Sequence, residues 1–353
     1  MRRWLKSVLL FVSTSALTLV GVEVALRIGY PHGIGLEIAG LEPFPWLRGD
    51  PVLGWANASG YRTPGLEINS LGMRGPEVEQ KPELRVLCLG DSRTFGVYST
   101  ETSFAAFDSE YPAELRKSLG AAFPDRAIEV LNLGVVGYTS SHVLRQLNTE
   151  IRDLHPDVLV VGVGFNDLLL SWDPGLRTQE PASSLLRVVL YASSKARITQ
   201  LWLTALEFNP LRPKPLAMRW VELDEYKRNL ARIIETARGM HVPLLLIHQP
   251  LRALRLGDNR YRQGATENGM GMLFLSTGAR NLEEVHHQFD AYRDAAFQVA
   301  RELKAPLLDV GIAFQGQEQR VFGGYDLVHY NPYGAQVVAR AVQDELERLG
   351  WLR

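Results

Sequence analysis

The feature of this 353-residue chain that most constrains its fold is a series of short apolar segments separated by segments with helical spacing. The apolar segments are 85–89, 128–131, 158–163, 243–247 and 306–310, and the helix-like segments are 112–119, 142–154, 222–238, 281–303 and 332–349. Continuously apolar strands that alternate with helices are typical of a parallel sheet covered on both faces. With right-handed crossovers, the sequence predicts an α/β fold, a three-layer α/β/α sandwich around a five-stranded parallel sheet.

Short polar signatures come directly after three of the predicted strands, and a fourth precedes the last helix. They are Gly-Asp-Ser-Arg-Thr-Phe-Gly at 90–96, Asn-Leu-Gly-Val-Val-Gly-Tyr-Thr at 132–139, Gly-Phe-Asn-Asp at 164–167 and Asp-Leu-Val-His at 326–329. Ligands of parallel α/β sheets bind at the carboxyl ends of the strands. Each signature alone is also compatible with a turn or a helix cap. Their order and their places in the predicted fold favour a catalytic site.

Three of these side chains have the chemistry of a catalytic triad. Ser92 lies at a strand-to-helix turn, but a serine hydroxyl is a weak nucleophile unless a base stands beside it. His329 is the best candidate for that base, because an imidazole titrates near neutral pH. Asp326 lies three residues earlier and could orient the imidazole through its other ring nitrogen.

From residue 85 to the C-terminal helix, these four signatures resemble those of the SGNH hydrolases, also called GDSL-type esterases and acylhydrolases. The resemblance implies a flavodoxin-like α/β/α fold with Ser92 as nucleophile, His329 as base and Asp326 as the residue that orients it. It also implies an oxyanion hole formed by the backbone of Ser92, the backbone of Gly137 and the side chain of Asn166. Arg93 stands where the older motif name has Leu, a position that varies in the family.

The chemistry agrees with this oxyanion hole. Negative charge develops on the substrate carbonyl oxygen during the reaction, so hydrogen-bond donors must converge there. Gly134 competes with Gly137, and the family spacing after Asn132 favours Gly137. Other polar residues near the motifs have structural interpretations. We expect Asp91 and Asp167 to bond loop backbones, and Arg74 to stabilise a turn rather than to reach the rim of the site.

The sequence predicts neither a cofactor nor a metal site. No His-Glu-x-x-His pattern and no nucleotide-binding loop occurs, and the single cysteine, Cys88, lies in an apolar segment where an inert buried thiol is expected. Among the other histidines, His248 lies just after a predicted strand and could line the pocket, although no carboxylate stands at comparable spacing. Lys and Arg (38) nearly balance Asp and Glu (39), which argues against nucleic acid as the main partner.

The N-terminus predicts membrane attachment. Arg2, Arg3 and Lys6 precede an uncharged stretch over 7–22, whose length lies between a signal-peptide core and a full membrane span. We expect an uncleaved anchor with the remaining chain on the periplasmic or extracellular side. A cleaved signal, which would give a secreted protein, and a soluble helix, for which Glu23 is the main evidence, are the alternatives.

Three segments are expected along the chain: an anchor over 1–30, an irregular spacer over 31–83 and a catalytic domain over 84–353 with insertions at about 168–221 and 251–277. The insertions are candidate lids, which could bind acyl chains, lie against the membrane or pack as core. The favoured function is an ester hydrolase acting on O-acyl or O-acetyl groups of envelope glycans or lipids. An O-acyltransferase that acetylates a cell-envelope polysaccharide with the same triad and a non-catalytic glycan-binding module are the alternatives. The oligomeric state is left open.

Overall fold

The computed structural model describes residues 2–29, 44–50, 53–79, 81–99, 104–106, 110–149, 151–171, 196, 198, 218–219, 221–252, 277–322 and 326–352. The chain divides into two compact units: residues 1–61 with 179–213, and residues 62–178 with 214–353. These units divide the chain differently from the three segments expected above, which stay a prediction.

The first unit contains helix α1 and a small hairpin. Helix α1 spans Arg2–Gly29, and its stretch Lys6–Gly29 is long and apolar enough to cross a membrane. Most of the large apolar side chains described in this helix are exposed. Glu23 pairs with Arg27 one turn later (2.7 Å), so the acidic side chain has a basic partner. The hairpin joins β1 (Leu47–Asp50) to β2 (Gly54–Asn57) in antiparallel register.

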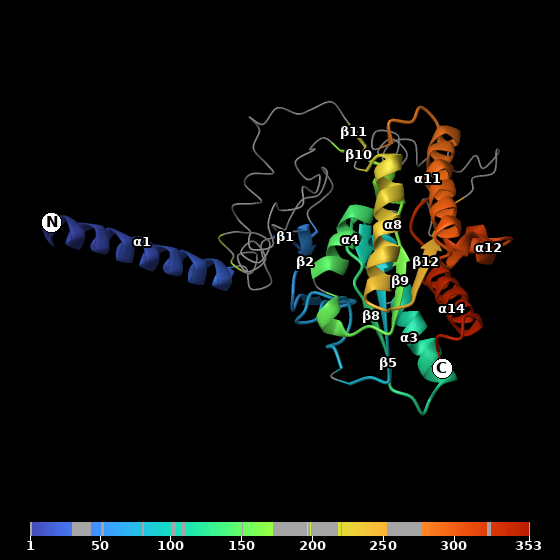
Figure 1. Cartoon of the computed structure of the whole chain (residues 1–353), viewed down its shortest axis with the longest axis horizontal. Helices are drawn as coiled ribbons and strands as arrows, with labels where there is room; N and C mark the ends of the chain where they lie inside the picture. Colours follow the sequence, from blue (N-terminus) through green and yellow to red (C-terminus); the bar gives the residue numbers. More distant parts are fainter. Residues whose placement is uncertain are drawn as a thin grey trace. The chain divides into compact units, whose positions relative to one another are not determined.

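The second unit is built on a five-stranded sheet whose strands are all parallel (Figure 1). Its strands are β5 (Leu84–Gly90), β8 (Ile128–Asn132), β9 (Val158–Gly162), β12 (Leu244–His248) and β13 (Leu307–Asp309). The strand order is β13-β12-β9-β5-β8, so the predicted five-stranded parallel sheet is confirmed. If the five strands are numbered 1 to 5 along the chain and read from β8, their order is 2-1-3-4-5. This is the flavodoxin-like arrangement.

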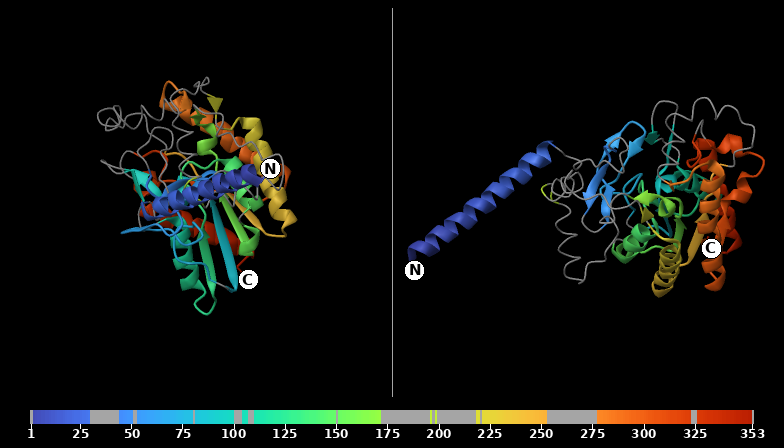
Figure 2. Two further views of the ribbon diagram at one scale, coloured as in Figure 1. Left: turned by 90° about the vertical axis from the view of Figure 1, so that its left-hand side faces the viewer. Right: turned by 90° about the horizontal axis from the view of Figure 1, so that it is seen from above.

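Helices cover both faces of the sheet because its strands are apolar on both sides (Figures 1 and 2). One face packs against α4 (Ser140–Thr149), α8 (Leu223–Gly239) and α11 (Leu282–Glu302). The other face packs against α3 (Tyr111–Ala122), α12 (Val310–Phe314) and α14 (Pro332–Arg348). Side chains alternate along the strands: Leu87 and Leu89 enter the first core, whereas Val86 and Cys88 enter the second. The three-layer α/β/α sandwich is therefore confirmed.

Shorter elements connect or decorate this framework. They are β3 (Arg62–Thr63), β4 (Leu66–Glu67), α2 (Ser92–Phe95), β6 (Val97–Ser99), β7 (Phe104–Ala106), the 3-10 turn η1 (Arg152–Leu154), α5 (Phe165–Leu168), β10 (Leu170–Ser171), β11 (Met218–Arg219) and α13 (Glu318–Val321). Strands β10 and β11 pair antiparallel and bring the two ends of the first expected insertion together. Most of that insertion and of the second, at 251–277, lies outside the described residues.

The strand order positions the site. Strand β8 lies on one side of β5 and all later strands lie on the other, so the chain reverses direction across the sheet at β5. In open α/β sheets the ligand crevice forms outside the carboxyl ends of the strands at such a switch point. The Gly-Asp-Ser motif begins at the carboxyl end of β5, and Gly-Phe-Asn-Asp comes after the neighbouring β9.

Candidate active site

Ser92 is the first residue of the short helix α2, directly after the central strand β5. Asp91 caps this helix, because its Oδ1 accepts a hydrogen bond from the backbone N–H of Arg93 (2.9 Å). The turn closes where the N–H of Gly96 donates to the carbonyl of Ser92 (2.8 Å). The serine hydroxyl is thus held at the edge of the sheet by a turn whose four helical residues are buried.

The loop before α14 brings His329 and Asp326 to this hydroxyl. His329 Nε2 lies 2.8 Å from Ser92 Oγ, and its Nδ1 lies 3.0 Å from Asp326 Oδ2. Asp326 Oδ1 also accepts hydrogen bonds from the backbone N–H groups of Val328 and His329 (both 2.9 Å). A carboxylate at Nδ1 keeps the proton on that nitrogen, so Nε2 is the nitrogen that can accept a proton from the serine.

The environment of Asp326 keeps it ionised. Burial acts to raise its pKa, but the neighbouring His329 and the hydrogen bonds from His329 and Val328 outweigh burial, and the pKa lies below its usual value. The carboxylate is 5 % exposed in its side chain, whereas the imidazole is 12 % exposed. The carboxylate is therefore more deeply buried than the imidazole beside it.

Two loops place the expected oxyanion donors near each other. Gly137 adopts a positive φ of 82°, which favours glycine, and the next residue, Tyr138, offers its carbonyl to Asn166 Nδ2 (2.9 Å). An amide Nδ2 has two hydrogens, so one remains for a substrate. The competing Gly134 donates its N–H to Asn132 Oδ1 (2.9 Å), so its donor is already used inside the protein.

Buried polar groups join the segments that carry Gly137 and Asn166. Asp167 accepts hydrogen bonds from the backbone N–H (3.0 Å) and the hydroxyl (2.5 Å) of Ser140, at the start of α4. Asn229, from α8, donates to the hydroxyls of Ser140 (3.0 Å) and Ser141 (2.8 Å). Burial raises the pKa of Asp167 to about 7, although the hydrogen bonds from Ser140 oppose this shift. Asp91 and Asp167 both accept hydrogen bonds from backbone N–H groups, but these groups belong to Arg93 and Ser140 at the starts of α2 and α4 and not to the loops that were expected.

Arg74 and Asn132 hold the far end of the turn that begins at Ser92. Arg74 Nη1 donates to the carbonyls of Phe95 (2.7 Å) and Gly96 (2.8 Å), and its Nη2 lies 3.4 Å from Glu110. Asn132 Nδ2 donates to the carbonyl of Thr94 (2.9 Å). The side chain of Arg74 is 3 % exposed, so it supports the turn from inside the protein.

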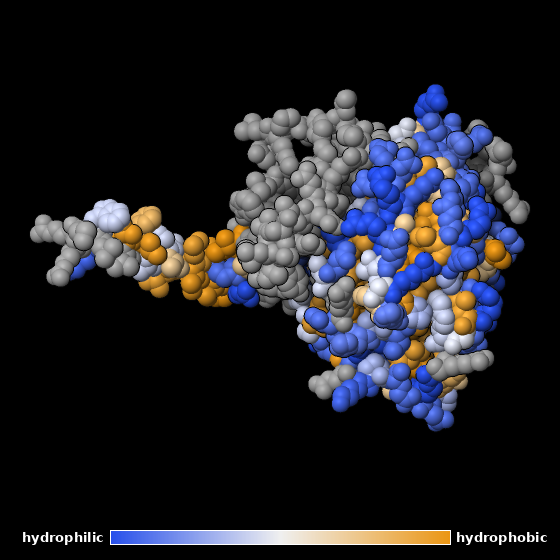
Figure 3. Space-filling view, viewed as in Figure 1, coloured by the Kyte–Doolittle hydropathy of each residue, from blue (hydrophilic) through white to orange (hydrophobic). Residues whose placement is uncertain are grey.

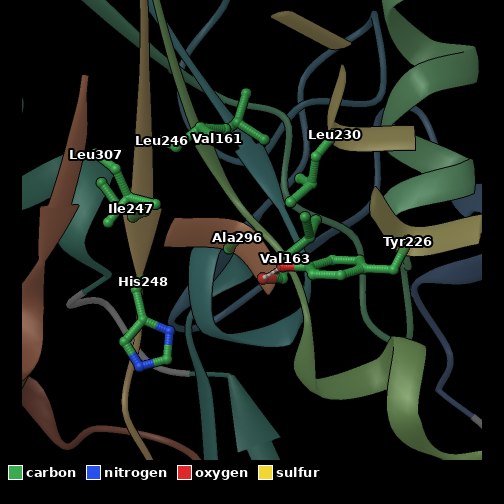
Figure 4. A pocket seen from close by; sticks show the side chains of 9 residues that line it. All are labelled: Val161, Val163, Tyr226, Leu230, Leu246, Ile247, His248, Ala296 and Leu307. Atoms are coloured by element: carbon green, nitrogen blue, oxygen red, sulfur yellow. Dashed lines mark hydrogen bonds between the residues drawn. The ribbon is translucent and has the colours of Figure 1, made fainter. Parts of the chain in front are cut away.

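His248 lies at the end of β12 and lines an apolar pocket on the face covered by α8 and α11 (Figure 4). The pocket is lined by Val161, Val163, Tyr226, Leu230, Leu246, Ile247, His248, Ala296 and Leu307. Burial, with help from the charges of Arg93 and Arg293, lowers the pKa of His248 to about 3. The described surface over α8 and α11 is mostly polar, with apolar surface showing between the two helices (Figure 3).

His142 resembles His248 in its chemistry. It stacks on Tyr138 with ring centroids 4.7 Å apart, and burial lowers its pKa to about 3. An imidazole with such a pKa is neutral near pH 7 and binds a proton too weakly to serve as an efficient general base there.

Within the described ranges, no group of three His, Cys, Asp or Glu side chains is arranged to hold a metal ion.

Sequence reasoning missed two residues that support the site. Asn229 is a polar residue on the buried side of an otherwise amphipathic helix, and that position was the available signal. Arg93 is a charged residue inside a buried turn, where a charge needs a partner, and that position was the available signal.

The sequence matches the model of a known family, and several solved structures align with the chain at low identity. The model of the GDSL-like lipase/acylhydrolase family matches residues 88–337. No curated protein matches the sequence. Among solved structures, an acetylxylan esterase from Geobacillus stearothermophilus is 18% identical with a TM-score of 0.45 and aligns over 78% of this chain and 99% of its own.

Two further solved structures are similar to this chain at the same level. A carbohydrate acetylesterase from Sinorhizobium meliloti is 13% identical (76% of this chain, 100% of that chain, TM-score 0.47). An alpha/beta hydrolase enzyme from the metagenome of Lake Arreo, Spain, is 20% identical (77% of this chain, 97% of that chain, TM-score 0.45). Since the family model covers most of the second unit and contains all four motifs, the chain belongs to the GDSL-like lipase/acylhydrolase family of carboxylic ester hydrolases.

Proposed function

We propose that the protein is a serine esterase in which Ser92 attacks the carbonyl carbon of an O-acyl ester. His329 Nε2 takes the hydroxyl proton as the Oγ–C bond forms, and returns it to the leaving alcohol as the C–O bond breaks. The acyl-serine is then hydrolysed by a water that His329 deprotonates, which releases the carboxylic acid and restores the hydroxyl. Asp326 holds the imidazole tautomer and stabilises the imidazolium that forms in each half-reaction.

One observation carries this proposal. Ser92 Oγ, the His329 imidazole and the Asp326 carboxylate form one continuous chain of contacts of 2.8 and 3.0 Å at the switch point of the sheet. These are hydrogen-bond distances, as the proton transfer requires. His142 and His248 are poor substitutes as a base, since burial lowers both of their pKa values to about 3.

The oxyanion role belongs, in this proposal, to the N–H groups of Ser92 and Gly137 and to Asn166 Nδ2. The Asn166 amide is fixed by its bond to the Tyr138 carbonyl (2.9 Å), so its second hydrogen points in a set direction. A donor that is oriented in advance needs no reorganisation when charge develops on the carbonyl oxygen.

The proposed substrates are acyl or acetyl esters of envelope glycans or lipids, and the proposed location is the outer side of a membrane. Support comes from α1, whose stretch Lys6–Gly29 can span a membrane by length and composition and lies after the basic residues Arg2 and Arg3. An enzyme tethered in this way meets substrates that cannot diffuse away from the envelope.

Turnover of p-nitrophenyl acetate by the purified full chain tests the reaction. Wild type should hydrolyse the ester, and Ser92→Ala should lose at least about a thousandfold in kcat. Ser118→Ala is the matched control, because this hydroxyl lies in α3 and donates to the local carbonyl of Leu115 (3.1 Å). Full activity in Ser92→Ala would refute the assignment. The same assay is repeated with an added glycan acceptor. If it yields acylated glycan instead of free acetate, the assigned reaction is acyl transfer and not hydrolysis.

Membrane attachment is tested by deleting residues 1–30. We expect the shortened protein to move from the membrane pellet to the supernatant with its esterase rate unchanged. Continued sedimentation with membranes would place the contact surface elsewhere in the chain.

A further inference from the structure

Arg93, the residue directly after the proposed nucleophile, is as buried as a core residue. Its side chain is 1 % exposed, and so is that of its partner Asp91. Arg93 Nη2 lies 3.1 Å from Asp91 Oδ2 and its Nε lies 3.4 Å from Asp91 Oδ1. The residues on either side of Ser92 are therefore joined to each other by a two-point ion pair.

The same guanidinium connects the nucleophile turn to a distant strand. Arg93 Nη1 donates to the carbonyl of Gln249, the residue after β12 (2.7 Å). Strand β9 lies between β5 and β12 in the sheet, so this hydrogen bond links the turn after β5 to the segment that follows a strand two positions away. This bond fixes the position of α2 along the carboxyl edge of the sheet.

Arg93 also packs against the turn that carries Asn166. Its guanidinium carbon is 5.8 Å from the centroid of the Phe165 ring, and Phe165 precedes Asn166 in α5. Burial raises the pKa of Tyr330, the residue after His329, and the charge of Arg93 opposes this shift. One cation therefore contacts the segments that present the proposed nucleophile and the proposed oxyanion amide.

Stability alone is a weak reason for this arrangement. A buried ion pair loses the hydration of both charges, and well-packed apolar residues of similar size often stabilise a protein as much or more. What Arg supplies, and an apolar residue lacks, is a planar fork that fixes several oxygen atoms in one geometry. Here the fork holds both oxygens of Asp91 and the Gln249 carbonyl.

We propose that Arg93 is a positioning residue that sets the angle of the Ser92 turn toward His329 and Asn166. The inference rests on the proposed role of Ser92 as nucleophile. The hydroxyl must meet both the imidazole and the ester carbon, and a misplacement of about 1 Å at a reacting group can lower a rate about a hundredfold.

Arg93→Lys is the direct test, because Lys keeps the charge but replaces the fork by a single ammonium group. The matched control is Arg85→Lys at the amino end of the same strand. Arg85 is also buried (7 % exposed), pairs with Glu129 at 2.5 Å and donates to the carbonyls of Leu154 and Glu79. Both variants lose a buried fork, but only one lies beside the proposed site.

With p-nitrophenyl acetate, we expect Arg93→Lys to lower kcat and the acylation burst rate about 10- to 100-fold, with KM changed by less than about threefold. Arg85→Lys should lower the melting temperature by a similar amount and keep kcat near the wild-type value. If Arg93→Lys fails to fold, the double variant Asp91→Asn/Arg93→Met removes both charges together, and the same loss of kcat is expected.

Three outcomes would overturn the inference. They are a wild-type kcat in Arg93→Lys or in the folded double variant, an equal loss of kcat in Arg85→Lys, and failure of both site variants to fold. Ser92→Ala is measured in parallel. Retained activity in Ser92→Ala defeats the proposed function itself, whereas an inactive Ser92→Ala beside a fully active Arg93→Lys defeats only the role of Arg93.

Discussion

The hydroxyl of Ser92 and the imidazole of His329 are 237 residues apart in the chain and 2.8 Å apart in the structure. Ser92 lies directly after the central strand β5, and His329 lies on the loop that leads into α14. Helices α14 and α3 share the core on one face of the sheet, which fixes where this loop returns to the carboxyl edge. The contact is thus a consequence of how the last helix packs.

Asp326→Asn should lower kcat by about 10⁴-fold while the protein stays folded. In wild type, the N–H groups of Val328 and His329 donate to Asp326 Oδ1, and the amide oxygen of the variant can still accept these bonds. Its NH₂ group, however, donates to Nδ1 and so favours the imidazole tautomer with the proton on Nε2. The measurement is kcat for an activated ester beside the circular dichroism spectrum. A variant within tenfold of wild type would show that the carboxylate does not orient His329.

Asn166→Ala should lower kcat by about 10²- to 10³-fold, because one donor to the developing oxyanion is lost. The control is Asn148→Ala, in which the lost amide donates to the carbonyl of Leu144 within α4 (2.9 Å). Steady-state kinetics on a short acyl ester separate the two variants. Equal effects in both, or a change confined to KM, would count against an oxyanion role for Asn166.

Gly134→Ala should destabilise the protein and reduce activity together. A Cβ at this position would collide with the backbone of Thr94 and Phe95, which belong to the nucleophile turn. Gly120→Ala is the control, because the residue lies in helix α3 and its Cβ would meet no described atom within 4 Å beyond its chain neighbours and the backbone of its own helix. That change should stabilise the protein by about 0.5–1 kcal/mol. Urea unfolding of both variants checks this, and a neutral Gly134→Ala would contradict the packing described.

Asp167→Asn should change how stability depends on pH. Burial raises the pKa of Asp167 from 3.8 to about 7, so the folded protein keeps a proton that the unfolded chain loses. The contribution of this group to stability is therefore fully present below about pH 4 and is lost as pH rises to about 7.

The readout is the difference in unfolding free energy between wild type and Asp167→Asn, measured from pH 4 to pH 8. As pH rises, the unfolding free energy of Asp167→Asn should increase relative to that of wild type by up to about 4 kcal/mol. Above about pH 7 this difference should stay constant. A difference that does not vary with pH would show that this carboxyl is ionised throughout the range.

The sequence predicted the sheet and the site motifs because both depend on local signals. The buried strands are mostly apolar, and the predicted segment 158–163, for example, begins with β9 and ends one residue after it. Turn and cap chemistry then marks the carboxyl end of a strand, as Asp91 does between β5 and α2. The carboxyl ends of parallel strands share one edge, so the motifs converge there whatever the details of packing.

Contacts that cross the sheet were not predictable in the same way. The bond from Arg93 to the Gln249 carbonyl depends on which strand lies two places from β5, and strand order is not written in any one segment. Asn229 meets Ser140 because α8 packs beside α4, and that pairing depends on the shapes of both helices. Local patterns therefore identify the reacting groups, whereas tertiary packing determines which residues position them.

The most direct test of Ser92 as the nucleophile is covalent labelling of the active protein with a serine-directed organophosphate, followed by tryptic peptide mapping. We expect stoichiometric loss of activity with one modified peptide, residues 86–93, phosphorylated on Ser92, and no labelling of His329→Gln under the same conditions. Inactivation with the label on any other serine, or full activity after complete labelling of Ser92, would contradict the assignment.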